Sequence, residues 1–514
     1  MGKANQLRSG VVLTYINMAL GMIIPFVYTP LMLRMLGQSE YGLYSLSSSV
    51  VGYLSLLSFG FGNTVIRYIS KYRHEGNKEA VERTYGFFIM LYMAMAVLVM
   101  ICGIILANNV EPIFQKGLTD AEQAKMRTLV IIMAGSSAIA FPLSVFTSMV
   151  VSYEKFIFRQ ILNVFSTVFA PISNLIMLFL GYKSVGMALA SFAVQAVVLP
   201  ANIYYITRHL GIKPKFKMIE KSLFKEMVSV SFFHFLGAIV DMLFWSTDKV
   251  ILGMLTSTTV VAIYNVGAHF NDMVIKLSSA ITGVLAPKVT GMVVRNAGKN
   301  ELTELFIRIG RVQFLIIGLI STGFIAFGRQ FISLWVGNSY MEAYSIALLT
   351  LLPLCIPLIQ NTGITILVAQ NKHQFRAVVY FIIAIANVVS TWLIVKYTNL
   401  GGFGAALCSC ISFVAGQGIV MNFYYWKKTG IDIPLFWRNI LKMAIIPACM
   451  CVITMLGIKF TGVFTERNWI VFFALVFVYT AIYIFLMYKL AMNDYEKDIL
   501  RKPVQAVIRK IKRK

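Results

Sequence analysis

The chain has 514 residues, of which 58% are hydrophobic and 13% charged, and its formal net charge is +25. Soluble globular proteins are about 25% charged, so this composition excludes an ordinary soluble domain and indicates a protein embedded in lipid. The 46 lysines and arginines alternate with long apolar runs instead of forming one basic patch. This arrangement argues against nucleic acid as a partner and makes the charge a signal of membrane topology.

A transmembrane helix needs about 20 mostly apolar residues. Fourteen such runs follow the basic start MGKANQLRSG, with short connections and no room for a soluble domain. They cover residues 11–33, 43–66, 84–107, 128–151, 157–180, 184–207, 228–253, 260–286, 308–328, 343–368, 377–398, 402–425, 440–458 and 468–488. The sequence therefore predicts an all-α polytopic membrane protein with 14 transmembrane helices, and the first is expected to be an uncleaved helix rather than a signal peptide.

Lysine and arginine set the orientation of these spans. If the N-terminus lies inside, and basic residues among the first or last four residues of a span are counted with the adjoining loop, the cytoplasmic segments hold 35 of these residues and the opposite loops hold nine, while Lys249 and Lys276 lie deeper within spans. By the positive-inside rule, both termini are then cytoplasmic. The basic tail 491–514 is expected to be an orientation anchor, and an interaction with the anionic inner leaflet is the alternative.

The two halves of the chain resemble each other at four places. FRQILNVFSTV corresponds to FRAVVYFIIAIANVV, SVGMALASF to GFGAALCSC, NIYYITRHLGIKPKF to NFYYWKKTGIDIPLF, and LRMLGQSEYGLYSL to KVILGMLTSTTVVAIYNV. The aligned positions are Arg159 and Arg376, Gly186 and Gly404, Gly211 and Gly430, and Gly37 and Gly253. Six helices separate equivalent positions, and because six is an even number the repeat is parallel. The expected parts are an N-lobe (1–210), a C-lobe (211–430), helices 13 and 14 (431–490) and the tail (491–514).

The seventh span contains IVDMLFWSTDKVILGML, in which three side chains are charged: Asp241, Asp248 and Lys249. A charged residue at the centre of a membrane helix costs about 2.5–3.5 kcal/mol on insertion scales. His234, Asp241 and Asp248 are seven residues apart, so a continuous helix would place them on one stripe. Such a stripe must face a partner helix or water.

The eighth span has a similar polar face. His269, Asp272 and Lys276 share one side of a helix, and Asp272 and Lys276 are spaced for an ion pair. The candidates for binding a coupling ion, H⁺ or Na⁺, are Asp241, Asp248, His269 and Asp272. The structural alternative is an internal salt-bridge network, in which Asp272 pairs with Lys276 while Asp248 and Lys249 are tied to the eighth helix.

Prolines mark two places where a helix can bend or break. Pro25 and Pro30 lie in the first span, and the tenth span contains LLPLCIPLIQNTG. Because proline removes a backbone hydrogen bond, we expect the tenth helix to be interrupted, with its freed carbonyls facing protein or water. The gating candidates are Pro25, Pro30, Pro353, Pro357, Gln360 and Asn361. A simple packed kink is the alternative.

The sequence gives no sign of a metal centre or a cofactor. All six cysteines lie inside apolar runs, and the pairs Cys408/Cys410 and Cys449/Cys451 lack CxxC spacing and nearby loop histidines. We therefore expect no metal and no cofactor other than the coupling ion.

Three segments, YTPLMLRMLGQSEYGLYSL, KYRHEGNKEAVERT and DKVILGMLTSTTVVAIYNVG, resemble the polysaccharide-unit flippases of the multidrug/oligosaccharidyl-lipid/polysaccharide exporter superfamily. The resemblance covers essentially the whole chain. It implies two lobes around a central cavity that opens alternately to the two sides of a bacterial cytoplasmic membrane. It also implies a cargo, an oligosaccharide on a polyprenyl diphosphate, moved from the inner to the outer leaflet for cell-surface polysaccharide assembly.

Such a cargo would meet cationic, polar and aromatic groups. The cargo-binding candidates are Arg34, Asn63, Trp245, Lys249 and Lys276. The related lipid II flippases carry arginine in the middle of the first helix, where this chain has GMIIPFVY, which argues against lipid II as the cargo. The other expected partners are membrane lipids and membrane proteins of polysaccharide assembly, and the protein itself is expected to be a monomer.

Two other functions compete with this one. An enzyme acting on sugar units would need an acid or metal constellation on a sizeable external loop. The loops 181–183, 254–259 and 399–401 are little more than turns, and no nucleophile elbow, phosphate loop or HExxH motif occurs, so we expect no enzyme. A multidrug or organic-cation antiporter on the same fold is the stronger alternative, because acids and Trp245 suit a cation.

Overall fold

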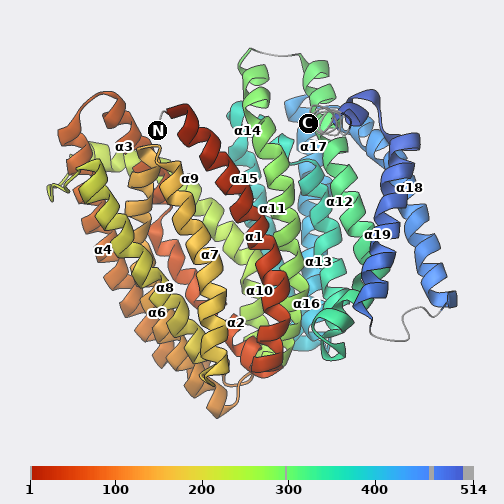
Figure 1. Ribbon diagram of the computed structural model, residues 1–514, viewed down its shortest axis with the longest axis horizontal. Helices are drawn as coiled ribbons and strands as arrows, with labels where there is room; N and C mark the ends of the chain where they lie inside the picture. Colours follow the sequence, from red (N-terminus) through yellow and green to blue (C-terminus); the bar gives the residue numbers. More distant parts are fainter. Residues whose placement is uncertain (1–2, 296–297, 462–467, 500, 502–514) are drawn as a thin grey trace, which may run out of the picture. The chain divides into compact units, whose positions relative to one another are not determined.

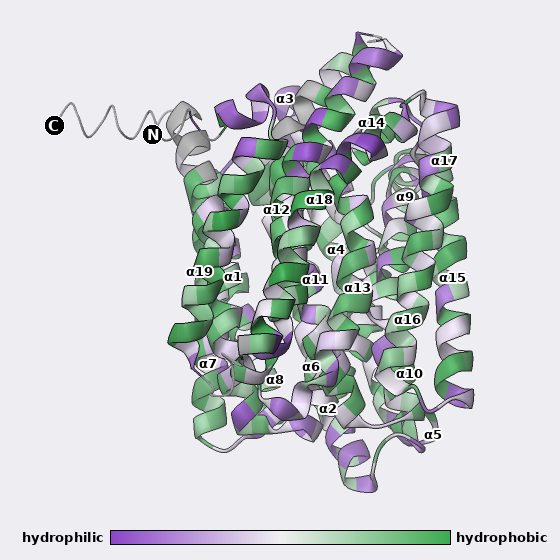
Figure 2. Cartoon of the chain, turned by 90° about the vertical axis from the view of Figure 1, so that its right-hand side faces the viewer, coloured by the Kyte–Doolittle hydropathy of each residue, from purple (hydrophilic) through white to green (hydrophobic). Residues whose placement is uncertain are grey.

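The computed structural model describes residues 3–295, 298–461, 468–499 and 501, and within these ranges every regular element is a helix (Figure 1). In a helix, the backbone N–H and C=O groups form hydrogen bonds with one another, as they must where a lipid environment provides no water. Figure 2, in which the backbone is coloured by residue hydropathy, shows hydrophobic residues along most of the helices and hydrophilic ones concentrated toward the helix ends. The prediction of an all-α membrane protein is confirmed.

The helices alternate along the chain with short connections. In the first half they are α1 (Lys3–Leu36), α2 (Gln38–Gly52), η1 (Tyr53–Ser58), α3 (Phe61–His74), α4 (Lys78–Asn108), α5 (Val110–Phe114), α6 (Asp120–Ser152), α7 (Phe156–Phe179), α8 (Lys183–Tyr205) and η2 (Ile206–Leu210). In the second half they are α9 (Lys221–Trp245), α10 (Thr247–Leu255), α11 (Thr258–Val294), α12 (Lys299–Trp335), η3 (Asn338–Tyr340), α13 (Glu342–Ile359), α14 (Thr362–Ala369), α15 (His373–Tyr397), α16 (Gly401–Phe413), η4 (Val414–Met421), α17 (Asn422–Tyr424), η5 (Tyr425–Thr429), α18 (Ile433–Thr461), α19 (Trp469–Leu486) and η6 (Met487–Ala491).

Thirteen helices in the described part of the chain are long and apolar enough to cross a membrane. The expected eighth span falls within α11, which has 37 residues but is not one of the thirteen. Its first half carries the polar residues Asn265, His269, Asn271 and Asp272, which lower its hydropathy. The number fourteen therefore stays a prediction.

Three of the four aligned segments have matching local structures, which supports the parallel repeat. Phe158 stacks on Tyr205 with ring centroids 3.8 Å apart and planes at 9°, and the equivalent Phe375 stacks on Tyr424 at 3.9 Å and 9°. Gly211 and Gly430 both end a π-helix in the left-handed conformation. The packing at Gly186 is repeated at Gly404, and at each glycine an added Cβ would lie within 3.0 Å of the turn that begins the helix.

The fourth aligned pair differs. Gly37 has a φ of 79° and separates α1 from α2, whereas Gly253 lies inside α10. These two glycines are therefore not conformational equivalents, even though their surrounding sequences are similar.

The chain packs into two compact units that do not coincide with the repeat halves. One unit comprises Met1–Asn265 and Ala384–Ala405, and the other comprises Val266–Ile383 and Ala406–Lys514. The first unit thus contains α9, α10 and the first turns of α11, which belong to the second half of the sequence. The lobe boundaries 1–210 and 211–430 describe the repeat and stay predictions as divisions of the fold.

Three of the expected spans are broken helices. The second is interrupted by η1 and by Phe59 and Gly60, both left-handed, and the seventh is interrupted at Ser246. The tenth breaks between Ile359 and Thr362, so the predicted interruption is confirmed. The carbonyl of Leu358, just before that break, accepts a hydrogen bond from the backbone N–H of Asn361 at 3.3 Å and another from the hydroxyl of Ser278 at 3.2 Å, so it is satisfied within the protein.

Candidate functional site

A group of buried and half-buried polar side chains in the first unit surrounds the start of α10. Asp248 is in the first turn of this helix, where a negative charge is favoured, and it is only 1% exposed. The hydroxyl of Tyr264, on α11, donates a hydrogen bond to Asp248 Oδ2 at 2.6 Å. A buried carboxylate is thus stabilised by the neighbouring helix rather than left bare.

The adjacent Lys249 extends this arrangement to a third helix. Its ammonium donates to Asn265 Oδ1 at 3.2 Å, and Asn265 Nδ2 donates to the hydroxyl of Tyr41 on α2 at 2.5 Å. The hydroxyls of Thr247 and Tyr53 are also 2.5 Å apart. We call this set the α10 polar cluster: Tyr41, Tyr53, Thr247, Asp248, Lys249, Tyr264 and Asn265.

The broken seventh span changes two expectations: how its charged side chains are aligned, and which groups Asp248 and Lys249 bind. Because the seventh helix breaks at Ser246, His234, Asp241 and Asp248 do not form one continuous stripe. His234 and Asp241 are exposed, whereas Asp248 is buried. Asp248 and Lys249 are tied to helix α11, as the structural alternative proposed, and the partners found are Tyr264 and Asn265.

The side chains expected to share a polar face of α11 are His269, Asp272 and Lys276. Asp272 and Lys276 are exposed, and in the described part of the chain they form no ion pair with each other. His269 is half-buried. The Asp272–Lys276 pair of the structural alternative is therefore not formed, and exposed charges on helices of a membrane protein require water or an external polar partner.

Three further cargo-binding candidates, Arg34, Asn63 and Trp245, are not members of the α10 polar cluster. Arg34 is exposed in the last turn of α1, and Asn63 is exposed in the first turn of α3. Trp245 is half-buried at the end of α9. Their roles stay predictions.

The gating candidates occupy two sites. Pro25 and Pro30 lie inside the unbroken α1. Pro353 and Pro357 lie inside α13, before the break at Gln360 and Asn361. Gln360 is 2% exposed, and its Nε2 donates to Asn422 Oδ1 at 2.6 Å. The break is thus packed within protein, and its part in gating stays a prediction.

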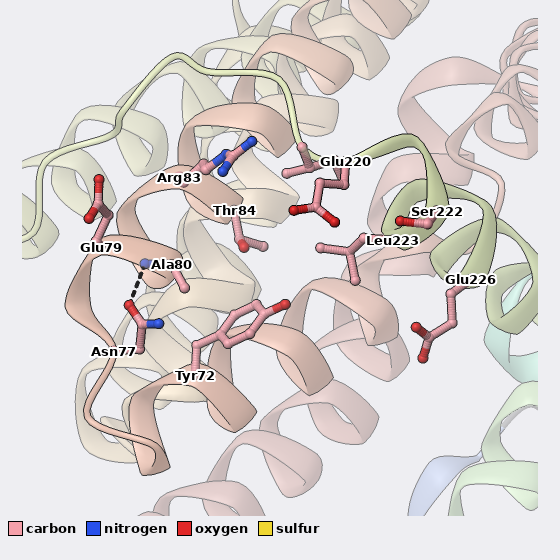
Figure 3. A pocket seen from close by; sticks show the side chains of 11 residues that line it. Tyr72, Asn77, Glu79, Ala80, Arg83, Thr84, Glu220, Ser222, Leu223 and Glu226 are labelled. Atoms are coloured by element: carbon pink, nitrogen blue, oxygen red, sulfur yellow. Dashed lines mark hydrogen bonds between the residues drawn. The ribbon is translucent and has the colours of Figure 1, made fainter.

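A polar pocket that the sequence did not suggest lies at the ends of α3, α4 and α9 (Figure 3). Its volume is about 540 Å³ and its lining residues are Tyr72, Asn77, Glu79, Ala80, Arg83, Thr84, Ile219, Glu220, Ser222, Leu223 and Glu226. Nε and Nη2 of Arg83 both donate to the carbonyl of Met218, at 3.0 and 2.6 Å. Three glutamates and an arginine already bonded to the backbone suit a cationic group better than a phosphate.

An apolar groove of about 420 Å³ lies among α12, α18 and α19 in the second unit. Its lining residues are Phe327, Met450, Ile453, Thr454, Gly457, Ile458, Leu475, Val478, Tyr479, Ile482 and Leu486. Such a surface can hold a hydrocarbon chain through dispersion contacts. No group of three or more metal-ligating side chains occurs in the part of the chain that the structure describes.

Solved structures of transporters share this fold. The chain matches "Lipid II flippase MurJ, inward closed conformation" with a TM-score of 0.71 and 15% identity, covering 93% of this chain and 98% of that one. It also matches an inward-facing multidrug resistance MATE family transporter of the MOP superfamily, with a TM-score of 0.64 and 13% identity over 84% and 99% of the two chains. At these identities the similarity shows the fold alone.

Two sequence comparisons are more specific. "Uncharacterized membrane protein EpsK" of Bacillus subtilis (strain 168) is 21% identical over 430 residues, which cover 80% of this chain and 82% of EpsK. A family described as "Polysaccharide biosynthesis protein" matches residues 7–293, more than half of the chain. The resemblance noted in the sequence is thus confirmed, and the chain belongs to the polysaccharide biosynthesis protein family, with the fold of the MurJ and MATE transporters.

Proposed function

We propose that this protein is a flippase that moves a polyprenyl-diphosphate-linked oligosaccharide from the inner to the outer leaflet of a bacterial cytoplasmic membrane. The family match carries the proposal, because that family is described by polysaccharide biosynthesis while the fold is that of membrane transporters. The protein works by alternating access, with both termini in the cytoplasm and a gradient of H⁺ or Na⁺ as the energy source.

Two features of the structure support a cargo with a charged head and an apolar tail. Asp241, Asp272 and Lys276 are exposed charges on α9 and α11, so a hydrated path has to accompany these helices. The groove among α12, α18 and α19 offers an apolar surface for a polyprenyl chain. In the proposed mechanism Lys276 attracts the diphosphate, while Asp241 or Asp272 binds the coupling ion.

An organic-cation antiporter is the second candidate, and exposed Asp241 and Asp272 are the observation in its favour. The MATE transporter with the same fold bears a multidrug resistance name. The family match favours the oligosaccharide, because the description of that family concerns polysaccharide and not drugs.

The test uses purified protein in liposomes with an imposed Na⁺ or H⁺ gradient. Translocation of a short-chain polyprenyl-diphosphate oligosaccharide and of an organic cation is measured side by side. We expect gradient-dependent movement of the lipid-linked sugar, reduced at least about tenfold by Asp241→Asn or by Asp272→Asn, because replacing the carboxylate that binds the ion removes a charge that the coupling ion needs.

Glu111→Gln is the matched control, because Glu111 is an exposed acid in the short helix α5. It should transport like the unaltered protein. Movement of the organic cation alone would overturn the oligosaccharide proposal. Movement of the sugar that does not depend on either gradient, with both aspartate variants fully active, would overturn ion coupling.

A further inference from the structure

We infer that Ser39, Glu122 and Thr258 form an external clasp, which holds α2 and α6 of the first repeat half against the start of α11 and has to open when cargo leaves the protein. The inference rests on the proposed alternating-access transport. It names residues that neither the sequence patterns nor the family match identified.

The clasp is a hydrogen-bonded cluster around one carboxylate. Glu122 Oε1 accepts from the hydroxyl of Ser39 at 2.6 Å and from that of Thr258 at 2.7 Å. Glu122 Oε2 accepts from the backbone and the hydroxyl of Thr119, both at 2.9 Å. A carboxylate is the stronger kind of acceptor, so one side chain joins three helix ends.

Glycines bring the same elements unusually close together. A Cβ on Gly42 would lie 1.8 Å from the carbonyl oxygen of Thr258, and a Cβ on Gly117 would lie 1.9 Å from that of Gly253. A Cβ on Gly253 would in turn lie 2.5 Å from the side chain of Leu46. Since real Cβ atoms essentially never approach other atoms below 3.0 Å, and a backbone carbonyl cannot move aside as a side-chain end can, the contacts of Gly42 and Gly117 require glycine.

All these residues lie at the helix ends that the charge distribution predicts to be outside. They belong to one compact unit, in which α2 packs against α10 in the lower part of Figure 1. The external ends of α15 and α16 are in that unit too, as its second segment, Ala384–Ala405, shows. A transporter that releases cargo outward has to separate second-half helix ends from the first half here, and the clasp opposes that separation.

The neighbouring Glu40 provides a matched comparison. Its carboxylate accepts from Lys125 at 2.7 Å and from the hydroxyl of Ser184 at 2.5 Å. These partners lie on α6 and α8, so this second carboxylate cluster connects only helices of the first half. Removing it disturbs the same surface without touching α11.

The experiment measures how fast an external, membrane-impermeant maleimide labels Leu46→Cys in membranes. Leu46 is fully buried against Gly253, so labelling requires α2 and α10 to separate. Glu122→Ala and the double variant Ser39→Ala/Thr258→Val should each raise the rate about tenfold or more, because they remove hydrogen bonds to a charged acceptor. Glu40→Ala and Thr119→Ala, which leave the bonds to Ser39 and Thr258 in place, should change it less than about threefold.

A second arm tests whether opening is needed. Ser39→Cys/Thr258→Cys, oxidised with copper phenanthroline, should stop translocation, and reduction should restore it; unaltered protein treated identically controls for the native cysteines. The inference is overturned if Glu40→Ala raises labelling as much as Glu122→Ala does, if neither clasp variant raises it, or if the crosslinked protein still transports. Because labelling needs no cargo, increased labelling in a protein that moves no oligosaccharide would count against the proposed function and leave the clasp standing.

Discussion

At the scale of single residues, the bond between Tyr264 and Asp248 is the clearest case of a charged group held in an apolar setting. Hydrogen bonds to charged groups contribute about 1.5–3 kcal/mol, and neutral ones about 0.5–1.5 kcal/mol. Tyr264→Phe removes a donor from a carboxylate that is 1% exposed. We therefore expect this variant to lower the free energy of unfolding by about 1.5–3 kcal/mol, measured by denaturant unfolding in detergent micelles.

The control is Tyr479→Phe, which deletes a hydroxyl that donates to the neutral hydroxyl of Thr322 at 2.8 Å. Its loss should be about half as large. In a background of Asp248→Asn, which removes the charge, Tyr264→Phe should also cost only about as much as this control. Equal losses in all backgrounds would mean that Asp248 is not charged in the folded protein.

At the scale of an element, the segment 493–499 is fastened to α12 by an ion pair. Arg311 Nε and Nη2 donate to the two carboxylate oxygens of Glu496 at 2.6 and 3.0 Å. The Glu496 side chain is 0% exposed and that of Arg311 is 11% exposed. Removing one partner of a buried pair leaves an uncompensated charge, at a cost of about 3–5 kcal/mol.

Glu496→Ala should therefore release this segment and lower stability, seen as faster protease cleavage between residues 493 and 499 and a lower Tm. Arg311→Leu/Glu496→Leu should recover most of the stability, because two apolar side chains of similar volume leave no charge unpaired. Glu304→Ala is the control, because it removes an exposed i,i+4 partner of Arg308 and should change Tm little. A double variant as unstable as Glu496→Ala would contradict this account.

The elements also show how far sequence reasoning reached. The break in the tenth helix was predictable, because Pro357 precedes the polar pair Gln360 and Asn361 in a local pattern. The break at Ser246 carried a weaker signal, the helix-start residues Ser-Thr-Asp inside an otherwise apolar run. Only glycines in the sequence indicated the break at Phe59 and Gly60. Glycine is common in membrane helices, so its presence does not predict a break.

The candidate site was predictable in its charges and not in its contacts. Asp248 and Lys249 stand out in an apolar span, but their partners are 16 residues further along the chain, across a turn between two helices. The close packing at Gly42 and Gly117 could not be predicted from the sequence, because it depends on which backbone segment lies opposite each glycine. Tertiary packing also places α9 and α10 with the first unit, which no local pattern encodes.

At the scale of the whole molecule, the topology depends on whether α11 crosses the membrane. If α11 crosses, the chain has fourteen spans and both termini share one side; if it does not, every later loop changes sides. By the positive-inside rule, the 35 basic residues on the predicted cytoplasmic side favour the first arrangement, because the inversion after α11 would move the C-terminal basic segments outside. A polar face is compatible with a crossing helix where it borders water or protein rather than lipid.

Cysteine accessibility in intact cells decides between these arrangements. Lys183→Cys precedes α11 and identifies the outside, while Asn300→Cys in the first turn of α12 and Asn338→Cys just after α12 follow α11; all three positions are exposed. We expect an impermeant maleimide to label positions 183 and 338 directly and position 300 only after permeabilisation, with the unaltered protein as the control for native cysteines. Direct labelling at 300 with protection at 338 would show that α11 does not cross, and it would place the C-terminal basic tail on the side opposite to the N-terminus.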